Sequence, residues 1–305
     1  LRETGTAVTS EGALVMEVAE PGDDKEVPPL LLEKSGGGYL YGTSDLATIQ
    51  ERVERFRAQE ILYVVDKRQA LHFTQVFRAA RKAGIAGPQV RMVHVGFGTM
   101  NGPDGKPFKT REGGVMRLAD LVQLVETKAR EKMKEAGVAQ DLSAEEQDDV
   151  ARNVGMATLK FADLSNHRES DYVFDLDKFT RFEGKTGPYL LYTAVRIKSI
   201  LRNAQQKNLS GGPILPPSDQ ERGLILLLGS IPDVLSSTRE GLTPNYLCDF
   251  AYSLAQEFNR FYRDCHILSE PDREKQASWI SLVSVVLREL ELILKIPRIR
   301  IPEQI

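Results

Sequence analysis

The sequence predicts an α/β part with a small parallel sheet, followed by an all-α bundle. Between residues 44 and 136, apolar runs typical of strands alternate with amphipathic patterns typical of helices. From residue 143 onward helical patterns dominate, and several begin with capping signals. Short connections between strands and helices favour right-handed parallel units in the first part. We expect a boundary near residue 183, which gives domains of residues 1–182 and 183–305.

The composition is that of an ordinary globular protein. Of the 305 residues, 41% are hydrophobic and 27% are charged, which excludes collagen-like, purely coiled-coil and disordered classes. The formal net charge of −3 does not by itself predict a nucleic-acid partner, although a local basic patch is compatible with it. The two cysteines, Cys248 and Cys265, form neither a disulfide framework nor a metal-site pattern. No apolar run is long enough to span a bilayer. We therefore expect a cytoplasmic chain with no membrane contact and no metal centre.

The α/β part is expected to begin with two hairpins. Two pairs of apolar stretches flank runs of turn residues at 9–12 and 35–38, and the second pair ends at Tyr41. The run at 61–65 is continuously apolar, which is typical of a strand buried on both faces of a parallel sheet. The elements expected after Tyr41 are a helix capped by Ser44, a strand at 61–65, a helix at 69–83 ended by Gly84, a strand at 90–95, a glycine-rich loop at 96–114 and a helix at 118–136.

The second part is expected to be helical apart from a strand-like segment at 172–174. Ser143 and Glu146 form a capping-box pattern, and residues 208–217 are the clearest linker. The helices expected are 144–161, 187–207, 219–236, 244–265 and 272–295.

Ligands of parallel α/β sheets bind at the carboxyl ends of the strands, which here carry residues 41–45, 66–69 and the loop from Gly96. Within that loop Lys106, Lys109 and Arg111 lie close together on a glycine-rich segment. Fixed cations on such a segment suit a polyphosphate, because charge accumulates on its oxygens during transfer. The alternative is an ordinary solvated surface loop.

The other two strand ends offer polar groups of a different kind. Asp45 and Tyr41 combine a carboxylate with an aromatic ring, which suits a guanidinium ligand. The alternative is that Asp45 caps the helix and Tyr41 packs. Gln69 and His72 occupy the first turn of the next expected helix, where side chains point toward the strand ends. A lone histidine in this position is more often structural than catalytic.

Aromatic residues interleaved with arginines mark two of the expected helices in the second part. Such patterns can stack bases and contact phosphates, whereas core packing is the alternative. Core packing is favoured for Phe258 and Phe261. The two groups are Tyr189, Tyr192, Arg196 and Lys198 on one helix, and Phe258, Arg260, Phe261, Tyr262 and Arg263 on the other.

Taken together, several of these segments resemble the bacterial type of arginyl-tRNA synthetase, in family order and over nearly the whole chain. They are Tyr39–Ala47, Asp66–Gln69 with His72–Phe73, Asp104–Arg111, Phe161–Ser165, Asp171–Asp175, Phe182–Gly184 and Gly187–Tyr192. The resemblance implies the second half of a class I synthetase catalytic domain, with a partial Rossmann-type parallel sheet, followed by an all-α anticodon-binding bundle. It also implies an ATP-dependent ligase that joins L-arginine to tRNA(Arg) through an arginyl-adenylate, with tRNA bound during the first step. ATP brings its own Mg²⁺, no metal is held by the protein, and a monomer is expected.

The same resemblance implies roles for individual residues. Tyr41, Asp45 and Gln69 line the arginine pocket, and His72 lies near the same wall. Gly96, Phe97, Gly98 and Met100 border the adenine. Lys106 and Lys109 take the place of the class I Lys-Met-Ser-Lys-Ser loop as catalytic residues that hold the ATP phosphates, with Arg111 beside them. Tyr192, Arg196 and Tyr262 face the tRNA.

One departure from the family pattern matters. The other class I motif, His-Ile-Gly-His or a close variant, does not occur in the sequence. We therefore expect that the first half of the ATP site is absent and that this chain is inactive by itself. The alternative is an inactive fragment or paralogue that acts only as a tRNA-binding module.

Overall fold

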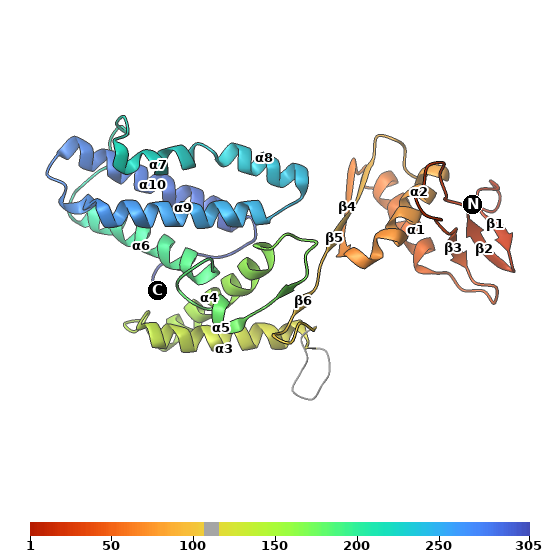
Figure 1. The fold of residues 1–305 in the computed structure, drawn as a ribbon, viewed down its shortest axis with the longest axis horizontal. Coiled ribbons are helices and arrows are strands. Elements are labelled where there is room, and N and C mark those ends of the chain that lie inside the picture. Colours follow the sequence, from red (N-terminus) through yellow and green to blue (C-terminus); the bar gives the residue numbers. More distant parts are fainter. Residues whose placement is uncertain (107–115) are drawn as a thin grey trace. The chain divides into compact units, whose positions relative to one another are not determined.

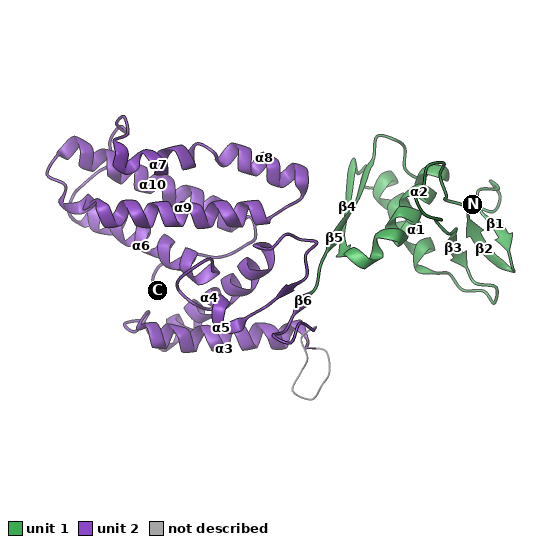
Figure 2. Cartoon of the chain, in the orientation of Figure 1, with its two compact units in different colours: residues 1–99 green, residues 100–305 purple. Residues whose placement is uncertain are grey.

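The computed structural model describes residues 1–106 and 116–305 (Figure 1). The chain divides into two compact units, Leu1–Thr99 and Met100–Ile305, which are considered separately (Figure 2). Residues 116–182, expected to share a domain with the parallel sheet, belong to the second unit. The domain boundary near residue 183 stays a prediction.

Unit 1 begins with an antiparallel sheet of three strands in the order β1-β2-β3. The strands are β1 (Val8–Ser10), β2 (Ala13–Met16) and β3 (Leu30–Glu33). The first expected hairpin is confirmed, and the second is confirmed in part, because the turn closes with an antiparallel bridge and a 3.1 Å hydrogen bond from the Leu40 amide to the Leu32 carbonyl but no second strand forms. After β3 the chain makes one bridge, between Glu33 and Tyr39, and helix α1 (Tyr41–Glu54) then begins at the residue expected to end a strand.

The predicted strand–helix–strand unit is confirmed. Strand β4 (Glu60–Asp66) pairs in parallel with β5 (Arg91–Phe97), and the connection between them is the short helix η1 (Lys67–Gln69) and α2 (Ala70–Lys82). Gly84 follows α2 with a left-handed φ of 70°, a conformation that glycine adopts at low cost.

The expected burial of β4 on both faces is wrong. Ile61 is buried among α1 and α2, but Leu62 and Val64 on the other face are 40% and 64% exposed. Within the described residues the parallel sheet has two strands, and the unit's core lies on one side of it. A strand that is apolar throughout is typical of a sheet covered on both sides, but one face of this two-stranded sheet is open in the described unit.

Unit 2 begins with strand β6 (Met100–Asn101), which pairs in parallel with β7 (Tyr172–Val173). Helices α3 (Leu118–Ala136) and α4 (Ala144–Leu164) pack against each other, and the short α5 (Leu176–Phe179) contacts both. Helix α3 has the bounds expected from the sequence. At the start of α4, Ser143 and Glu146 form the predicted capping box.

The helical bundle follows. Its elements are α6 (Gly187–Gln206), α7 (Asp219–Leu228), α8 (Ile231–Gly241), α9 (Asn245–Asp264), η2 (Ile267–Ser269) and α10 (Arg273–Lys295). The single helix expected at 219–236 is wrong, because Pro232 cannot donate the hydrogen bond that would continue α7. Phe258 and Phe261 are fully buried in the bundle core, as the packing alternative predicted. None of the helices in the two described ranges is long and apolar enough to cross a membrane.

Candidate functional site

The first candidate site lies where β4 ends and α1 and α2 come together in unit 1. Asp45 is in the second turn of α1, and His72 is in the first turn of α2. The Asp45 Oδ2 and His72 Nε2 atoms are 2.7 Å apart, although the residues are 27 positions apart in sequence. Their side chains are 27% and 29% exposed, so the carboxylate is held on one side and open to solvent on the other. Its remaining lone pairs can accept hydrogen bonds from a ligand.

The start of α1 differs from the expectation. The Thr43 and Ser44 amides donate to the Leu40 carbonyl, so the helix begins at Tyr41 and not after Ser44. Asp45 therefore does not cap the helix, which removes the structural alternative for it. Tyr41 is 84% exposed and does not pack as a core residue.

His72 packs against a cluster of aromatic side chains in the core of unit 1. The Phe73 ring packs edge-on against His72, with 5.1 Å between centroids, and stacks on His94 at 5.2 Å. Tyr63 of β4 lies 4.7 Å from Phe73, and the Arg52 guanidinium covers the Tyr63 ring at 5.1 Å. Burial raises the pKa of Tyr63 above its ordinary value, so its hydroxyl stays protonated. Tyr63 and His94 could not be predicted from the sequence, because they face each other across β4 and β5 only in the observed strand register.

The carboxyl ends of the two parallel strands meet as predicted, with Asp66 opposite Phe97. Gly96 permits a close approach there, because a Cβ atom on it would lie 3.1 Å from the Lys67 Cα. Gln69, exposed, immediately precedes α2 at the same edge. Phe97 is 43% exposed and Gly98 is half-buried. This edge therefore brings together the 66–69 segment and the start of the loop from Gly96.

Two further residues expected around ATP belong to unit 2. Met100 lies in β6 and is half-buried. Lys106 is exposed on a tight turn, where its carbonyl accepts a 2.7 Å hydrogen bond from the Gly102 amide and its amide donates to Asp104. Lys109 and Arg111 lie outside the described residues.

The three residues expected to face tRNA come together in one pocket of unit 2. Tyr192 and Arg196 lie on α6, and Tyr262 lies on α9. The Arg196 guanidinium carbon is 4.8 Å from the centroid of the Tyr192 ring and 5.7 Å from that of Tyr262. With Gln304 and other residues, they line a surface pocket of about 400 Å³. The arrangement presents a cation between two aromatic rings, which suits an RNA base and its phosphate.

A residue that the sequence analysis missed holds this arrangement in place. Asn259 accepts a 2.7 Å hydrogen bond from Arg196 Nη1 and donates to the Tyr189 hydroxyl and Thr193 Oγ1, at 3.0 and 3.1 Å. Asn259 lies three positions before Tyr262 and so falls near it on α9. A polar residue amid the aromatic stripe was the available signal.

Within the described parts of the chain, no three His, Cys, Asp or Glu side chains gather as metal ligands do.

Comparisons with known proteins agree with both units. The family model described as tRNA synthetases class I (R), catalytic domain, matches residues 1–176, and the DALR anticodon binding domain matches residues 190–305. An arginine–tRNA ligase of Maricaulis maris is 50% identical over 300 residues, covering 98% of this chain and 51% of the relative. The enzyme of Alkaliphilus oremlandii is 46% identical, covering 100% and 52%. The chain thus spans about half the length of these relatives.

Solved structures agree on the fold. The arginyl-tRNA synthetase of Plasmodium falciparum matches with a TM-score of 0.80 at 24% identity, over 100% of this chain and 51% of that one. The Thermus thermophilus arginyl-tRNA synthetase matches with a TM-score of 0.82 at 23% identity, over 96% and 54%. The predicted fold class, a partial class I catalytic domain followed by a helical anticodon-binding domain, is confirmed. The chain belongs to the arginyl-tRNA synthetase family of class I tRNA synthetases.

Proposed function

We propose that this chain supplies the arginine-binding and tRNA-binding parts of an arginine–tRNA ligase. The observation that carries the proposal is the Asp45 carboxylate, fixed by His72 yet open to solvent near the end of β4. A carboxylate that is held on one side and free on the other is suited to pair with the planar donor fork of a guanidinium.

In the proposed arginine pocket each residue has a distinct part. The free Asp45 oxygen accepts from the guanidinium, and His72 keeps the carboxylate in one orientation. Tyr41 offers its ring to the delocalised cation, and the exposed Gln69 offers an amide. His72 therefore acts as a positioning residue.

For ATP we propose that Gly96, Phe97, Gly98 and Met100 border the adenine, while Lys106, Lys109 and Arg111 hold the phosphates. The arginine carboxylate attacks the α-phosphorus of ATP, forming arginyl-adenylate and releasing pyrophosphate. Negative charge builds up on the phosphate oxygens during this step, and fixed lysines stabilise it. Mg²⁺ arrives with the nucleotide.

For tRNA(Arg) we propose the pocket formed by Tyr192, Arg196 and Tyr262, with the tyrosine rings stacking bases. Activation and transfer belong, in the same proposal, to the complete ligase of which this chain forms a part, a monomer in the cytoplasm.

We further propose that these 305 residues bind but do not catalyse. The exposed apolar face of β4, with Val64 64% exposed, indicates a sheet that is only partly present, and the sequence has no His-Ile-Gly-His motif. The competing possibility is a module that binds tRNA and has no part in ligation. It differs from our proposal in having no selectivity for arginine.

Two assays on this chain test the proposal. In filter binding at low salt, where phosphate contacts are strongest, we expect tRNA(Arg) to bind more tightly than an unrelated tRNA. Equal binding of the two RNAs, or none, contradicts the assignment of unit 2. In arginine-dependent ATP–pyrophosphate exchange with tRNA present, we expect no turnover, with lysine replacing arginine as the blank. Robust exchange contradicts the view that the ATP site is incomplete.

A further inference from the structure

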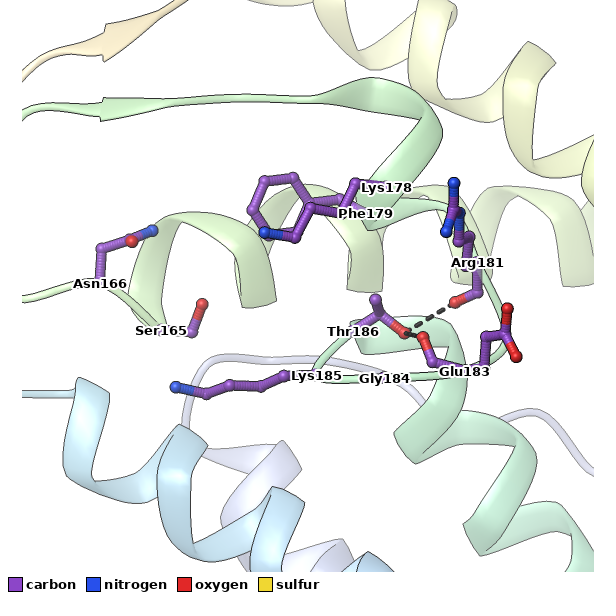
Figure 3. Close-up of a pocket in the computed structure, with 9 residues that line it drawn as sticks. All are labelled: Ser165, Asn166, Lys178, Phe179, Arg181, Glu183, Gly184, Lys185 and Thr186. Atoms are coloured by element: carbon purple, nitrogen blue, oxygen red, sulfur yellow. Dashed lines mark hydrogen bonds between the residues drawn. The ribbon is translucent and has the colours of Figure 1, made fainter.

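Unit 2 has a second basic pocket that none of the roles above uses. It has a volume of about 450 Å³ and lies where α4 ends and where the chain passes from α5 to α6 (Figure 3). Lys178, Arg181 and Lys185 contribute three cationic side chains to its lining, and Glu183 contributes one carboxylate. The hydroxyl of Ser165 and the amide of Asn166 add polar groups at the opposite wall.

Two of the three cations form no ion pair within the described ranges, although the charge of Arg181 acts on Asp177 and Lys178 Nζ lies 5.7 Å from the centroid of the Phe179 ring. Lys185 forms a 2.5 Å ion pair with Asp249 of α9. No carboxylate in residues 1–106 or 116–305 lies within ion-pair distance of Lys178 or Arg181. Both side chains are exposed and line the same pocket, so an anionic group that enters it meets two cations that no ion pair holds.

The backbone around the pocket is fixed. Thr186, only 3% exposed, donates from its hydroxyl to the Arg181 carbonyl at 2.7 Å and accepts from the Tyr189 amide, which caps α6. Gly184 takes a left-handed φ of 76° in the turn between them. On the other side, Phe179 stacks on the buried Phe174 with 5.4 Å between ring centroids, which anchors α5.

The end of α6 adds to the positive potential. This helix is 20 residues long, and its N-terminus, where the partial positive charge of the helix dipole resides, begins directly at Thr186. The dipole is an addition to the lysine and arginine side chains, which are the main source of positive charge.

We propose that this pocket, defined by Lys178, Arg181 and Lys185, binds a backbone phosphate of the tRNA. The inference rests on the proposed function, and it adds a contact outside the Tyr192–Arg196–Tyr262 pocket. The two pockets lie along the same helix, separated by roughly 10 to 20 Å at 1.5 Å per residue, so one folded RNA can reach both. Because the contact is to a phosphate, it raises the affinity for tRNA without discriminating between nucleotide sequences.

The test compares a double variant, Lys178→Gln with Arg181→Gln, with the unaltered chain in fluorescence anisotropy titrations. The probes are a tRNA(Arg) transcript and an unrelated tRNA, each at several salt concentrations. We expect about a tenfold loss of affinity for both RNAs and a log K against log salt slope that is shallower by about 1 to 2. The matched control is Arg239→Gln, an exposed arginine in the last turn of α8, which should leave both quantities unchanged.

The outcomes separate this inference from the proposed function. If the double variant binds both RNAs as the unaltered chain does, the phosphate site is refuted while the preference for tRNA(Arg) stands. A loss confined to tRNA(Arg) also refutes it, since a phosphate contact carries no sequence information. If the unaltered chain binds no tRNA even at low salt, both ideas fail. Circular dichroism melting checks that the variants, altered only at exposed side chains, remain folded.

Discussion

Replacing Asp45 with Asn removes the charge from the proposed arginine pocket while keeping the size of the side chain. The carboxylate lies 2.7 Å from His72 and faces solvent with 27% of its side chain exposed. No cavity forms, and an amide oxygen remains as an acceptor. The substitution therefore tests the charge of Asp45 and leaves its packing almost unchanged.

The expected magnitude follows from that exposure. Removing one partner of a buried, hydrogen-bonded charge pair costs about 2 to 5 kcal/mol. Asp45 is partly exposed and shared with His72, so the lower end applies, about 2 kcal/mol, or about a 30-fold weaker affinity for arginine.

The assay is calorimetric titration of the chain with L-arginine and with L-citrulline, a neutral analogue of nearly the same shape. The unaltered chain should prefer arginine, and Asp45→Asn should lose most of that preference while its citrulline affinity hardly changes. Asp24→Asn, at an exposed loop position of the same unit, is the matched control. An arginine-to-citrulline ratio that is the same in both proteins refutes the role given to Asp45.

Three other predictions concern unit 2. Burial raises the pKa of Glu289 to about 7 from 4.5, so the folded state holds a proton that the unfolded state releases, and stability falls as pH rises between about 4.5 and 7. At pH 8 the free energy of unfolding of Glu289→Gln should therefore exceed that of the unaltered chain by about 1 to 2 kcal/mol, whereas near pH 4 the two should be equal. A stability difference that does not change with pH contradicts this prediction. Tyr192→Ala should weaken tRNA(Arg) binding by about 1 to 3 kcal/mol and reduce the preference over an unrelated tRNA, and an unchanged preference argues against stacking. Asp272→Ala removes the side chain that caps α10 by accepting from two amides, and should lower stability in urea by about 1 kcal/mol; no change means that the cap is replaced by solvent.

Local signals predicted most of the helical part. The bounds of α3 and the capping box at Ser143 follow from short-range patterns, which act within a single turn. Short-range patterns did not predict the break between α7 and α8. The helical spacing of apolar residues continues past Pro232, so it favours one helix although the proline ends α7. At Tyr41, an apolar stretch after a turn favours a strand, whereas the backbone hydrogen bonds to the Leu40 carbonyl begin a helix.

The candidate site depended more on tertiary contacts. Residue chemistry and family resemblance selected Asp45 and His72, but their direct hydrogen bond requires α1 and α2 to pack together. Asn259 was not predicted, because its position in the aromatic stripe marks it as unusual but does not reveal its partners, Arg196, Tyr189 and Thr193. The two-sided burial expected of β4 failed for another reason, since it assumes neighbouring strands and helices that the described sheet does not include.

The Asn259 network has a consequence for the thermodynamics of binding. A free arginine side chain has about 2 kcal/mol of rotamer entropy to lose when it is immobilised. Arg196 has already lost much of that freedom, since it lies between two tyrosine rings and is tied to Asn259, which is itself tied to α6. A tRNA that binds in the pocket as we propose meets a pre-organised cation and loses little free energy in ordering it. In the proposed site, the affinity for tRNA therefore depends in part on the Asn259 amide, whose hydrogen bonds in the described residues all go to protein side chains.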